Sequence, residues 1–355
     1  MTDPLNLTPD RARDALATWL RERGEPAFRA KQILPRLWAR PVPSWDLATE
    51  LPAALRRDLE IAFPLRRLTL TTRQVSTDGT EKFLWDLGDG EAVESVLIPE
   101  GKRRTLCISS QVGCALGCVF CATGRMGFRR NLTVAEIAGQ VREVALLDPA
   151  LVPTNVVFMG MGEPLLNWEA VDGALTILNA PNGFGIGARH ITVSTVGILP
   201  TLAKLAARPE QFRLAVSLHA PTPDLRHALM PIEKKYALPE VMGALKQFRR
   251  RVTLEYVLIG GKNDGLEQAD RLAELARRLG ALVNLLPLHP GGAPDLSPSP
   301  RTQMIAFERR LKRRGVEAVL RRSRGLDISA ACGQLRVELE ARRRKVRSEE
   351  HAGVE

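Results

Sequence analysis

The sequence lacks the features that place a chain in a membrane or export it. No stretch approaches the run of about eighteen apolar residues that a membrane-spanning helix needs. The first residues, MTDPLNLTPDRARDAL, do not contain the succession of basic, apolar and small residues that marks a secretory signal. We therefore expect a cytoplasmic protein that has no membrane partner.

Cysteine and histidine are both scarce, with five of each in 355 residues. An odd number of cysteines in a chain expected in the cytoplasm argues against a framework of disulfide bonds and favours metal binding or redox catalysis. The hydrophobic content of 45% is enough for one large core or two modest ones. A catalytic domain with an accessory module is the organisation that this length and composition favour.

Acidic residues are outnumbered, since 40 Asp and Glu against 51 Lys and Arg leave a formal net charge of +11. Most of the excess is arginine, whose guanidinium group pairs with phosphates and stacks on bases. This predicts a polyanionic partner such as RNA. An arginine-rich surface is also typical of chains from GC-rich or heat-adapted sources, so charge alone leaves both interpretations open.

The composition divides the chain into four segments. Residues 1–66 carry two amphipathic helical stretches joined by a basic linker, which predict a small helical RNA-binding accessory domain. Residues 67–99 alternate polar and apolar side chains around a Gly-Asp-Gly turn and predict a β-hairpin extension. Residues 100–335 form the predicted catalytic domain, and the charged tail 336–355 has the composition of a disordered segment.

Within the catalytic segment, strand-like runs alternate with amphipathic helical runs from TLCISS to EAVLRR. This alternation is typical of a parallel β/α barrel, and its six units predict a partial (β/α)6 barrel in an α/β fold. Thr133 and Glu136 have the spacing of a capping box at the start of the first helix. The predicted helices span residues 133–147, 168–179, 198–207, 238–250, 266–279 and 301–314.

Three of the five cysteines, Cys114, Cys118 and Cys121, form the motif C-x-x-x-C-x-x-C. Three thiolates at this spacing can bind three irons of a [4Fe–4S] cluster and leave the fourth iron open for a small molecule. Zinc is the alternative, but zinc usually takes four ligands in two pairs, and the sequence has no second C-x-x-C or H-x-x-x-H pair. The spacing resembles that of the radical S-adenosylmethionine (SAM) superfamily, in which the open iron binds SAM.

Polar or glycine-rich runs follow three successive predicted strands, as GMGEP, STVG and SLHA. Ligands of β/α barrels bind beyond the carboxyl ends of the strands, so these runs are expected at one rim. Each residue taken alone is more often a helix cap or a packing residue. Their shared placement favours a ligand site, with the candidates Gly162, Glu163, Ser194, Ser217 and His219.

The runs QVGCALGCVFCATG, VFMGMGEPLLN, STVGI, AVSLHA and RGLDISAACGQL together resemble the bacterial dual-specificity ribosomal and transfer RNA (adenine-C2) methyltransferases. The resemblance covers residues 25–335. It implies methylation of adenine C2 in 23S ribosomal RNA, at the peptidyl transferase centre, and in transfer RNA next to the anticodon. It also implies a [4Fe–4S] cluster, two SAM molecules per product and an electron donor such as a flavodoxin-type reductant.

The resemblance also implies a role for individual residues. Cys332 would accept a methyl group from SAM and deliver it as a methylene, Cys107 would release the product by forming a disulfide bond with Cys332, and Glu94 would accept a proton. On the residues alone, either cysteine fits a buried packing role equally well, and Glu94 fits a solvated strand position. The cofactor-binding positions that the resemblance implies are Gly162, Glu163, Ser194, Ser217, Leu218, His219 and His289.

One position departs from the family pattern. Where relatives have asparagine in a run similar to N-L-I-P-x-N-P, this chain reads NLLPLHPGG and has His289, which can still donate to a ribose. Two alternatives stay open: the sister family that methylates adenine C8 and shares every cysteine, and a non-catalytic iron–sulfur RNA-binding protein. In the latter, Cys107 or Cys332 would supply the fourth ligand of the cluster.

Overall fold

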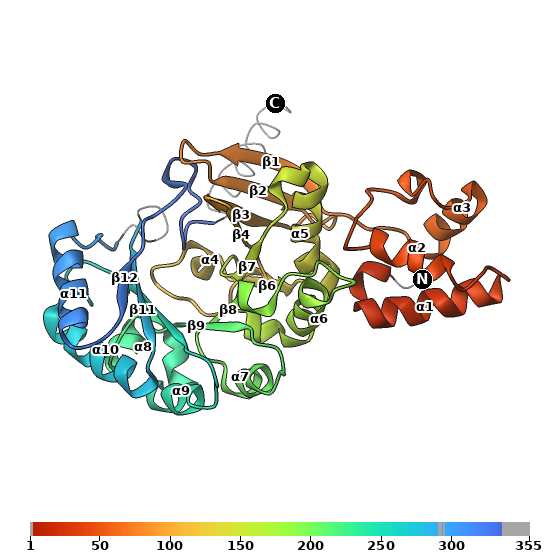
Figure 1. The fold of residues 1–355 in the computed structure, drawn as a ribbon. Helices are drawn as coiled ribbons and strands as arrows, with labels where there is room; N and C mark the ends of the chain where they lie inside the picture. Colours follow the sequence, from red (N-terminus) through yellow and green to blue (C-terminus); the bar gives the residue numbers. More distant parts are fainter. Residues whose placement is uncertain (1–2, 290–292, 294, 336–355) are drawn as a thin grey trace, which may run out of the picture.

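The centre of the molecule is one sheet of ten strands, which the computed structural model describes within residues 3–289, 293 and 295–335 (Figure 1). The strand order is β1-β2-β3-β4-β7-β8-β9-β10-β11-β12. The strands of this sheet are β1 (Thr69–Val75), β2 (Glu81–Asp86), β3 (Ala92–Glu100), β4 (Arg103–Cys107), β7 (Asn155–Phe158), β8 (Ile191–Thr195), β9 (Arg213–Ser217), β10 (Thr253–Leu258), β11 (Leu282–Pro287) and β12 (Ala318–Leu320).

From β4 to β12 every neighbouring pair of strands is parallel, and a helix follows each strand except the last. The sequence-based prediction of a partial (β/α)6 barrel is therefore confirmed. The carboxyl ends of the parallel strands meet at one rim, where the predicted ligand site belongs. The helices of the barrel are α5 (Val134–Leu147), α6 (Trp168–Asn179), α7 (Leu199–Ala206), α8 (Pro223–Leu229), α9 (Leu238–Leu245), α10 (Leu266–Leu279) and α11 (Arg301–Arg313).

One predicted helix is shorter than expected, because α9 ends at Leu245 and not at residue 250. The N–H groups of the three residues that follow donate to the carbonyl three residues earlier, the tighter 3-10 pattern that commonly ends an α-helix. The short helix α8 was not predicted. It begins at Pro223, a residue that favours the first position of a helix.

The predicted β-hairpin is instead a three-stranded antiparallel extension of the barrel sheet. β1 pairs with β2, β2 with β3, and β3 with the first barrel strand β4. Two aromatic residues of β2, Phe83 and Trp85, are fully buried on one face, and the indole of Trp85 donates to the Ser95 hydroxyl at 2.7 Å. The extension therefore shares the core of the barrel.

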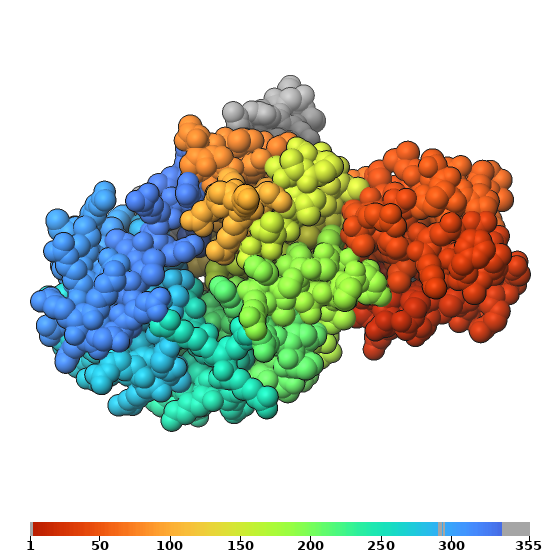
Figure 2. All heavy atoms as spheres, in the orientation of Figure 1, coloured from red at the N-terminus to blue at the C-terminus, as the bar shows by residue number. Residues whose placement is uncertain are grey.

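The N-terminal segment folds into α1 (Pro9–Glu22), α2 (Arg29–Ile33) and α3 (Ala53–Ala62) around a hydrophobic cluster of its own. This cluster also takes in side chains of α5 and α6, so the segment docks on the outside of the barrel (Figures 1 and 2). Arg142 of α5 is fully buried at this junction. Its guanidinium donates to the carbonyls of Leu37 at 3.0 Å and Val42 at 2.5 Å and pairs with Glu143 at 3.0 Å.

None of the helices in the described part of the chain is both long and apolar enough to cross a membrane. The predicted disorder of the tail 336–355 concerns residues outside those that the structure describes.

Candidate active site

The cysteine motif lies in the loop between β5 (Gln111–Gly113) and the short helix α4 (Ala122–Arg125), at the carboxyl rim of the barrel. β5 pairs with β6 (Phe128–Asn131), so the loop is closed at its base by a two-stranded ribbon. Gly113 has a φ of 73°, and a Cβ atom there would lie 1.9 Å from the carbonyl oxygen of Gly127. Only glycine allows this close approach, which lets the N–H of Cys114 donate to the Gly127 carbonyl at 3.0 Å.

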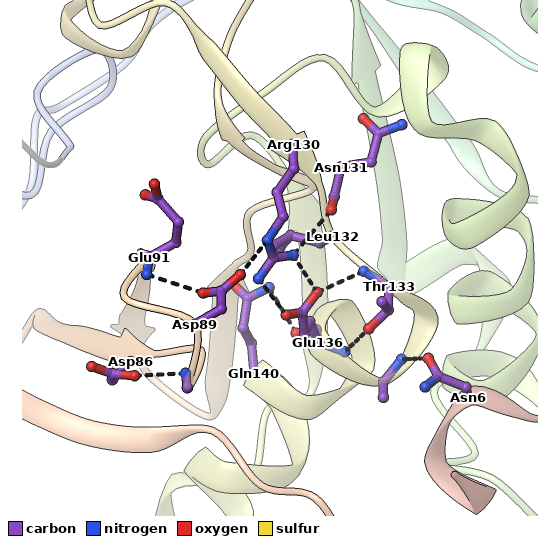
Figure 3. Close-up of polar contacts among 12 residues, drawn as sticks. Asn6, Asp86, Asp89, Glu91, Arg130, Asn131, Leu132, Thr133, Glu136 and Gln140 are labelled. Atoms are coloured by element: carbon purple, nitrogen blue, oxygen red, sulfur yellow. Dashed lines mark hydrogen bonds and ion pairs between the residues drawn. The ribbon is translucent and has the colours of Figure 1, made fainter. Parts of the chain in front are cut away.

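Arg130 anchors this ribbon to the rest of the fold (Figure 3). Its guanidinium pairs with Asp89 at 2.7 Å, in the turn between β2 and β3, and with Glu136 of α5 at 2.7 Å. The same Glu136 accepts from the N–H of Thr133 at 2.8 Å and donates its own N–H to the Thr133 hydroxyl at 3.2 Å. The predicted capping box is thus confirmed, and one arginine ties the cysteine loop to α5.

The three thiols suit a cluster in their chemistry and surroundings. Cys114 and Cys118 are buried, and Cys121 is partly buried. Burial raises the pKa of Cys114 to about 12, and burial with the negative charge of the other two thiolates raises the pKa of Cys118. Buried thiolates need compensating positive charge, which bound iron supplies.

Among the described residues, no three His, Cys, Asp or Glu side chains converge on a point that would hold a single metal ion. The ligands of a cubane bind three different irons, so they do not need to converge in this way.

A buried ion pair that the sequence did not predict supports the cysteine loop. Arg226 of α8 is fully buried, pairs with Glu233 and donates to the carbonyl of Val196 at 2.7 Å. The N–H of Val119 in the cysteine loop donates to the carbonyl of Leu229, at the end of α8, at 3.1 Å. Arg226 and Glu233 therefore join the cysteine loop to the loop that follows β8.

Glu163 links two of the predicted ligand loops. One carboxylate oxygen accepts from the N–H of Leu165 at 3.0 Å, and the other accepts from the N–H of Val196 at 2.9 Å. Burial raises the pKa of Glu163 to about 7, against the opposing effect of these hydrogen bonds. The neighbouring Gly162 has a φ of 95°, and a Cβ atom there would meet Gln111 at 2.5 Å. The prediction that these loops share one rim is correct in the structure.

His219 lies next to the cysteine loop and is held in an unusual backbone conformation, with a φ of 56°. Its Nδ1 accepts from the N–H of Val257 at 3.0 Å, and its ring meets that of Phe120 edge-on at 4.7 Å between centroids. Burial and, to a smaller extent, the positive charge of Arg226 lower the pKa of His219 to about 3. The imidazole is therefore neutral, and its Nε2–H is the donor.

The remaining predicted cofactor positions differ in what they offer. Ser194 is buried at the end of β8, and Ser217 is half-buried at the end of β9. Leu218 is fully buried, and its N–H donates to the carbonyl of Glu255, so it contributes packing and backbone position. His289 lies 2.6 Å from the Ser323 hydroxyl through Nε2, and burial lowers its pKa.

A buried carboxyl group inside the barrel was not predicted. Glu255 of β10 is 6% exposed and accepts from the side-chain amide of Asn284 at 3.0 Å. Burial raises the pKa of Glu255 to about 7. Its negative charge raises the pKa of Cys332. Little in the sequence indicates that Glu255 is buried, because a glutamate in a strand is usually solvated.

Cys107 and Cys332 are electrostatically coupled although 225 positions separate them in the chain. Cys107 is buried at the end of β4, and Cys332 is exposed. Burial raises the pKa of Cys107 strongly, and negative charge on Cys332 raises it further, so the two thiols are electrostatically coupled. Exclusion of water from the Cys332 sulfur by neighbouring atoms, with the negative charge of Glu255, raises the pKa of its thiol to about 11. Both are free thiols, so the disulfide bond predicted between them is not present in this structure.

Glu94 lies on β3 and is buried, which overturns the solvated position considered from the sequence. One of its carboxylate oxygens lies 3.6 Å from Nζ of Lys82, on the neighbouring strand β2. The carbonyl of Glu94 accepts from the Ser109 hydroxyl at 2.6 Å. Lys82 escaped the sequence analysis because a strand lysine is usually a surface residue.

The partial barrel with its cysteine loop has the architecture of radical SAM enzymes, and the model of the Radical SAM superfamily matches residues 108–276. A probable dual-specificity RNA methyltransferase RlmN from Gemmatimonas aurantiaca is 58% identical over 354 residues, which cover 100% of this chain and 98% of the relative. A probable dual-specificity RNA methyltransferase RlmN 3 from Opitutus terrae is 45% identical and covers 93% of this chain and 94% of its own length. The chain therefore belongs to the RlmN dual-specificity RNA methyltransferase family.

A solved structure supports the same assignment. A radical SAM methyltransferase from Sphaerobacter thermophilus superposes with a TM-score of 0.89 at 43% identity, and the match covers 95% of this chain and 99% of that one. The recognition made from the motifs is thus confirmed. The alternative of a non-catalytic iron–sulfur protein is set aside, because the relatives that match nearly the whole chain are named RNA methyltransferases.

Proposed function

We propose that this enzyme methylates C2 of an adenine base in RNA through a methylated Cys332. The observations that carry the proposal are the electrostatic coupling of Cys107 with Cys332 and the bond from the Ala122 N–H, next to Cys121, to the Gly333 carbonyl, next to Cys332, at 2.7 Å. C2 of adenine is an electron-poor ring carbon without a nucleophilic lone pair, so direct transfer from a sulfonium does not occur there. A carbon radical can add to it, and a pair of thiols provides both the carrier and the means of release.

The cofactor set follows from the superfamily and fits the residues present. Cys114, Cys118 and Cys121 hold a [4Fe–4S] cluster, and SAM binds at the rim formed by Gly162, Glu163, Ser194, Ser217, Leu218, His219 and His289. When bound, the reduced cluster would give one electron to SAM and so supply a 5′-deoxyadenosyl radical, and the oxidised cluster that remains would accept the electron that the later adduct gives up. The neutral His219 offers an N–H to oxygen atoms of SAM, and His289 offers one to its ribose.

The thiols and Glu94 then have distinct roles. Cys332 would receive a methyl group from a first SAM, and loss of one hydrogen atom to the radical that a second SAM supplies would leave a methylene radical on its sulfur. This carbon bonds to adenine C2, and the adduct loses one electron and its C2 proton, which passes to Glu94. The Cys107 thiolate attacks the Cys332 sulfur, the carbon takes up a proton, and methyladenine leaves as the Cys107–Cys332 disulfide forms.

We further propose that the substrates are 23S ribosomal RNA at the peptidyl transferase centre and transfer RNA next to the anticodon. The relatives named as dual-specificity RNA methyltransferases support two RNA substrates. The formal charge of +11 supports a polyanionic partner. The basic N-terminal helical domain (residues 1–66) would contact RNA, and a flavodoxin-type protein would supply electrons.

The test is the anaerobic reaction of reconstituted enzyme with RNA and SAM that carries a trideuterated methyl group. The proposal predicts 2-methyladenosine with two deuterium atoms and one hydrogen in the new methyl group, and one deuterium atom in 5′-deoxyadenosine. Direct transfer would retain all three deuterium atoms and contradict the mechanism. Mass spectrometry that finds only 8-methyladenosine would assign the enzyme to the C8 chemistry of the sister family.

A further inference from the structure

Lys82 is a buried cation that the proposed chemistry does not yet use. It is 4% exposed, and a lysine ammonium is rarely buried without compensating charge. Its Nζ lies 3.6 Å from a carboxylate oxygen of Glu94 and donates to the carbonyl of Ser329 at 3.4 Å. Lys82 therefore contacts the proposed proton acceptor on one side and, on the other, the segment that carries Cys332.

The register of the sheet places Lys82 on the same face as the reacting side chains. Lys82 lies opposite Val96 of β3, and Val96 lies opposite Cys107 of β4. Residues directly opposite each other in antiparallel strands project to the same face, and so do residues two apart in one strand. Glu94 is two residues from Val96, so Lys82, Glu94 and Cys107 share one face of the sheet.

Further bonds hold the Cys332 segment against the turn between β1 and β2, where the C-terminal part of the chain lies beside these strands (Figure 1). Asp78 accepts from the N–H of Gly325 at 3.0 Å. Asp327 accepts from the Ser76 hydroxyl at 2.5 Å and from the N–H of Thr77 at 3.0 Å. The segment thus keeps three anchors that do not involve Lys82.

We propose that Lys82 is a positioning residue that orients the Glu94 carboxylate and compensates its charge for removal of the C2 proton. The proposal rests on the proposed function. In the step concerned, the C2–H bond of the oxidised adduct breaks, the proton bonds to a Glu94 oxygen, and the electron pair returns to the adenine ring. Because the other anchors hold the Cys332 segment, Lys82 acts on this step and not on the loading of the methyl group.

The test uses full-length, cluster-loaded Lys82→Met, Lys82→Gln and Lys82→Arg variants. The two uncharged variants are expected to methylate Cys332 as the wild type does and to release product roughly 10- to 100-fold more slowly, since a displaced catalytic group costs rates of that order. The covalent protein–RNA adduct should accumulate. RNA with deuterium at adenine C2 should give a larger isotope effect on release than in the wild type, and Lys82→Arg should recover most of the lost rate.

Arg73→Met is the matched control, because Arg73 is another cation of this extension but pairs with Glu81 at 2.7 Å. It should leave the adduct level and the isotope effect unchanged. Wild-type release rates in both uncharged variants, or slow release with neither adduct nor a larger isotope effect, would overturn the role of Lys82. If one uncharged variant folds poorly or binds its cluster poorly, the other uncharged variant is compared with the wild type. If the wild type itself forms no methyl-Cys332, the proposed function fails instead.

Discussion

The backbone N–H of Ala122 donates to the carbonyl of Gly333 at 2.7 Å. This bond joins the residue after Cys121 to the residue after Cys332, so the end of the cysteine motif and the proposed methyl carrier are held together. A hydrogen bond between two backbone groups depends little on side chains, and it fixes the spacing of the two loops. The arrangement places the segment of Cys332 directly beside the cysteine loop.

The role of the cysteine motif is tested by removing one thiol. Cys118→Ala should fail to retain a full [4Fe–4S] cluster after anaerobic reconstitution, because the loop then offers two thiolates in place of three. Iron and sulfide content and the visible absorption spectrum measure this. Cys107→Ala is the control and should retain the cluster. Full cluster content in Cys118→Ala would show that the motif is not the binding site.

The buried Glu255 predicts a dependence of stability on pH. Burial raises its pKa to about 7 from the ordinary 4.5, so the folded protein binds this proton more tightly than the unfolded chain does. The contribution of this protonated carboxyl group to the free energy of unfolding is fully present below pH 4.5 and is lost as the pH rises through 7. The loss is roughly 3 kcal/mol. Glu255→Gln removes this loss. Urea unfolding of both proteins from pH 4 to pH 8 should show the variant gaining relative to the wild type, and parallel curves would contradict the assignment.

The junction between the N-terminal helices and the barrel depends on Arg142. In Arg142→Met, the carbonyls of Leu37 and Val42 lose their buried donor, and Glu143 keeps only its pair with Arg67 at 2.6 Å. The free energy of unfolding should fall by about 3 kcal/mol. Arg13→Met is the control, because Arg13 lies in an exposed pair whose loss costs about 0.5 kcal/mol or less. Equal losses in the two variants would contradict this account.

Affinity for RNA should fall steeply as salt concentration rises. Each phosphate that a Lys or Arg neutralises releases counterions, so the logarithm of the binding constant falls linearly with the logarithm of the salt concentration. Fluorescence anisotropy with a labelled transfer RNA measures the slope. The net charge of +11 leads us to expect several phosphate contacts. A binding constant that does not change with salt concentration would contradict a role of the basic surface in RNA binding.

Local patterns predicted much of this molecule. The helices at 168–179 and 266–279 have the predicted bounds, because apolar periodicity and helix-ending signals agree there. The rim loops were predicted because parallel strands bring their carboxyl ends together. Lys82, Arg226 and Glu255 were missed for one common reason: each is buried through partners on other elements, and an isolated sequence position gives no sign of such pairing. The third strand of the extension, β1, was missed because it is mostly polar and lies at the outer edge of the sheet, where it pairs only with β2.

The central claim is that Cys332 carries the methylene carbon and Cys107 releases the product. It is tested most directly by Cys107→Ala. If Cys107 alone cleaves the bond between Cys332 and the methylene carbon, the variant should form the covalent protein–RNA adduct and fail to release it. The adduct should resist denaturant and disappear with ribonuclease, and Cys332→Ala and the double variant should form none. Normal turnover by Cys107→Ala, with no trapped species on a denaturing gel, would make Cys107 a packing residue and contradict the mechanism.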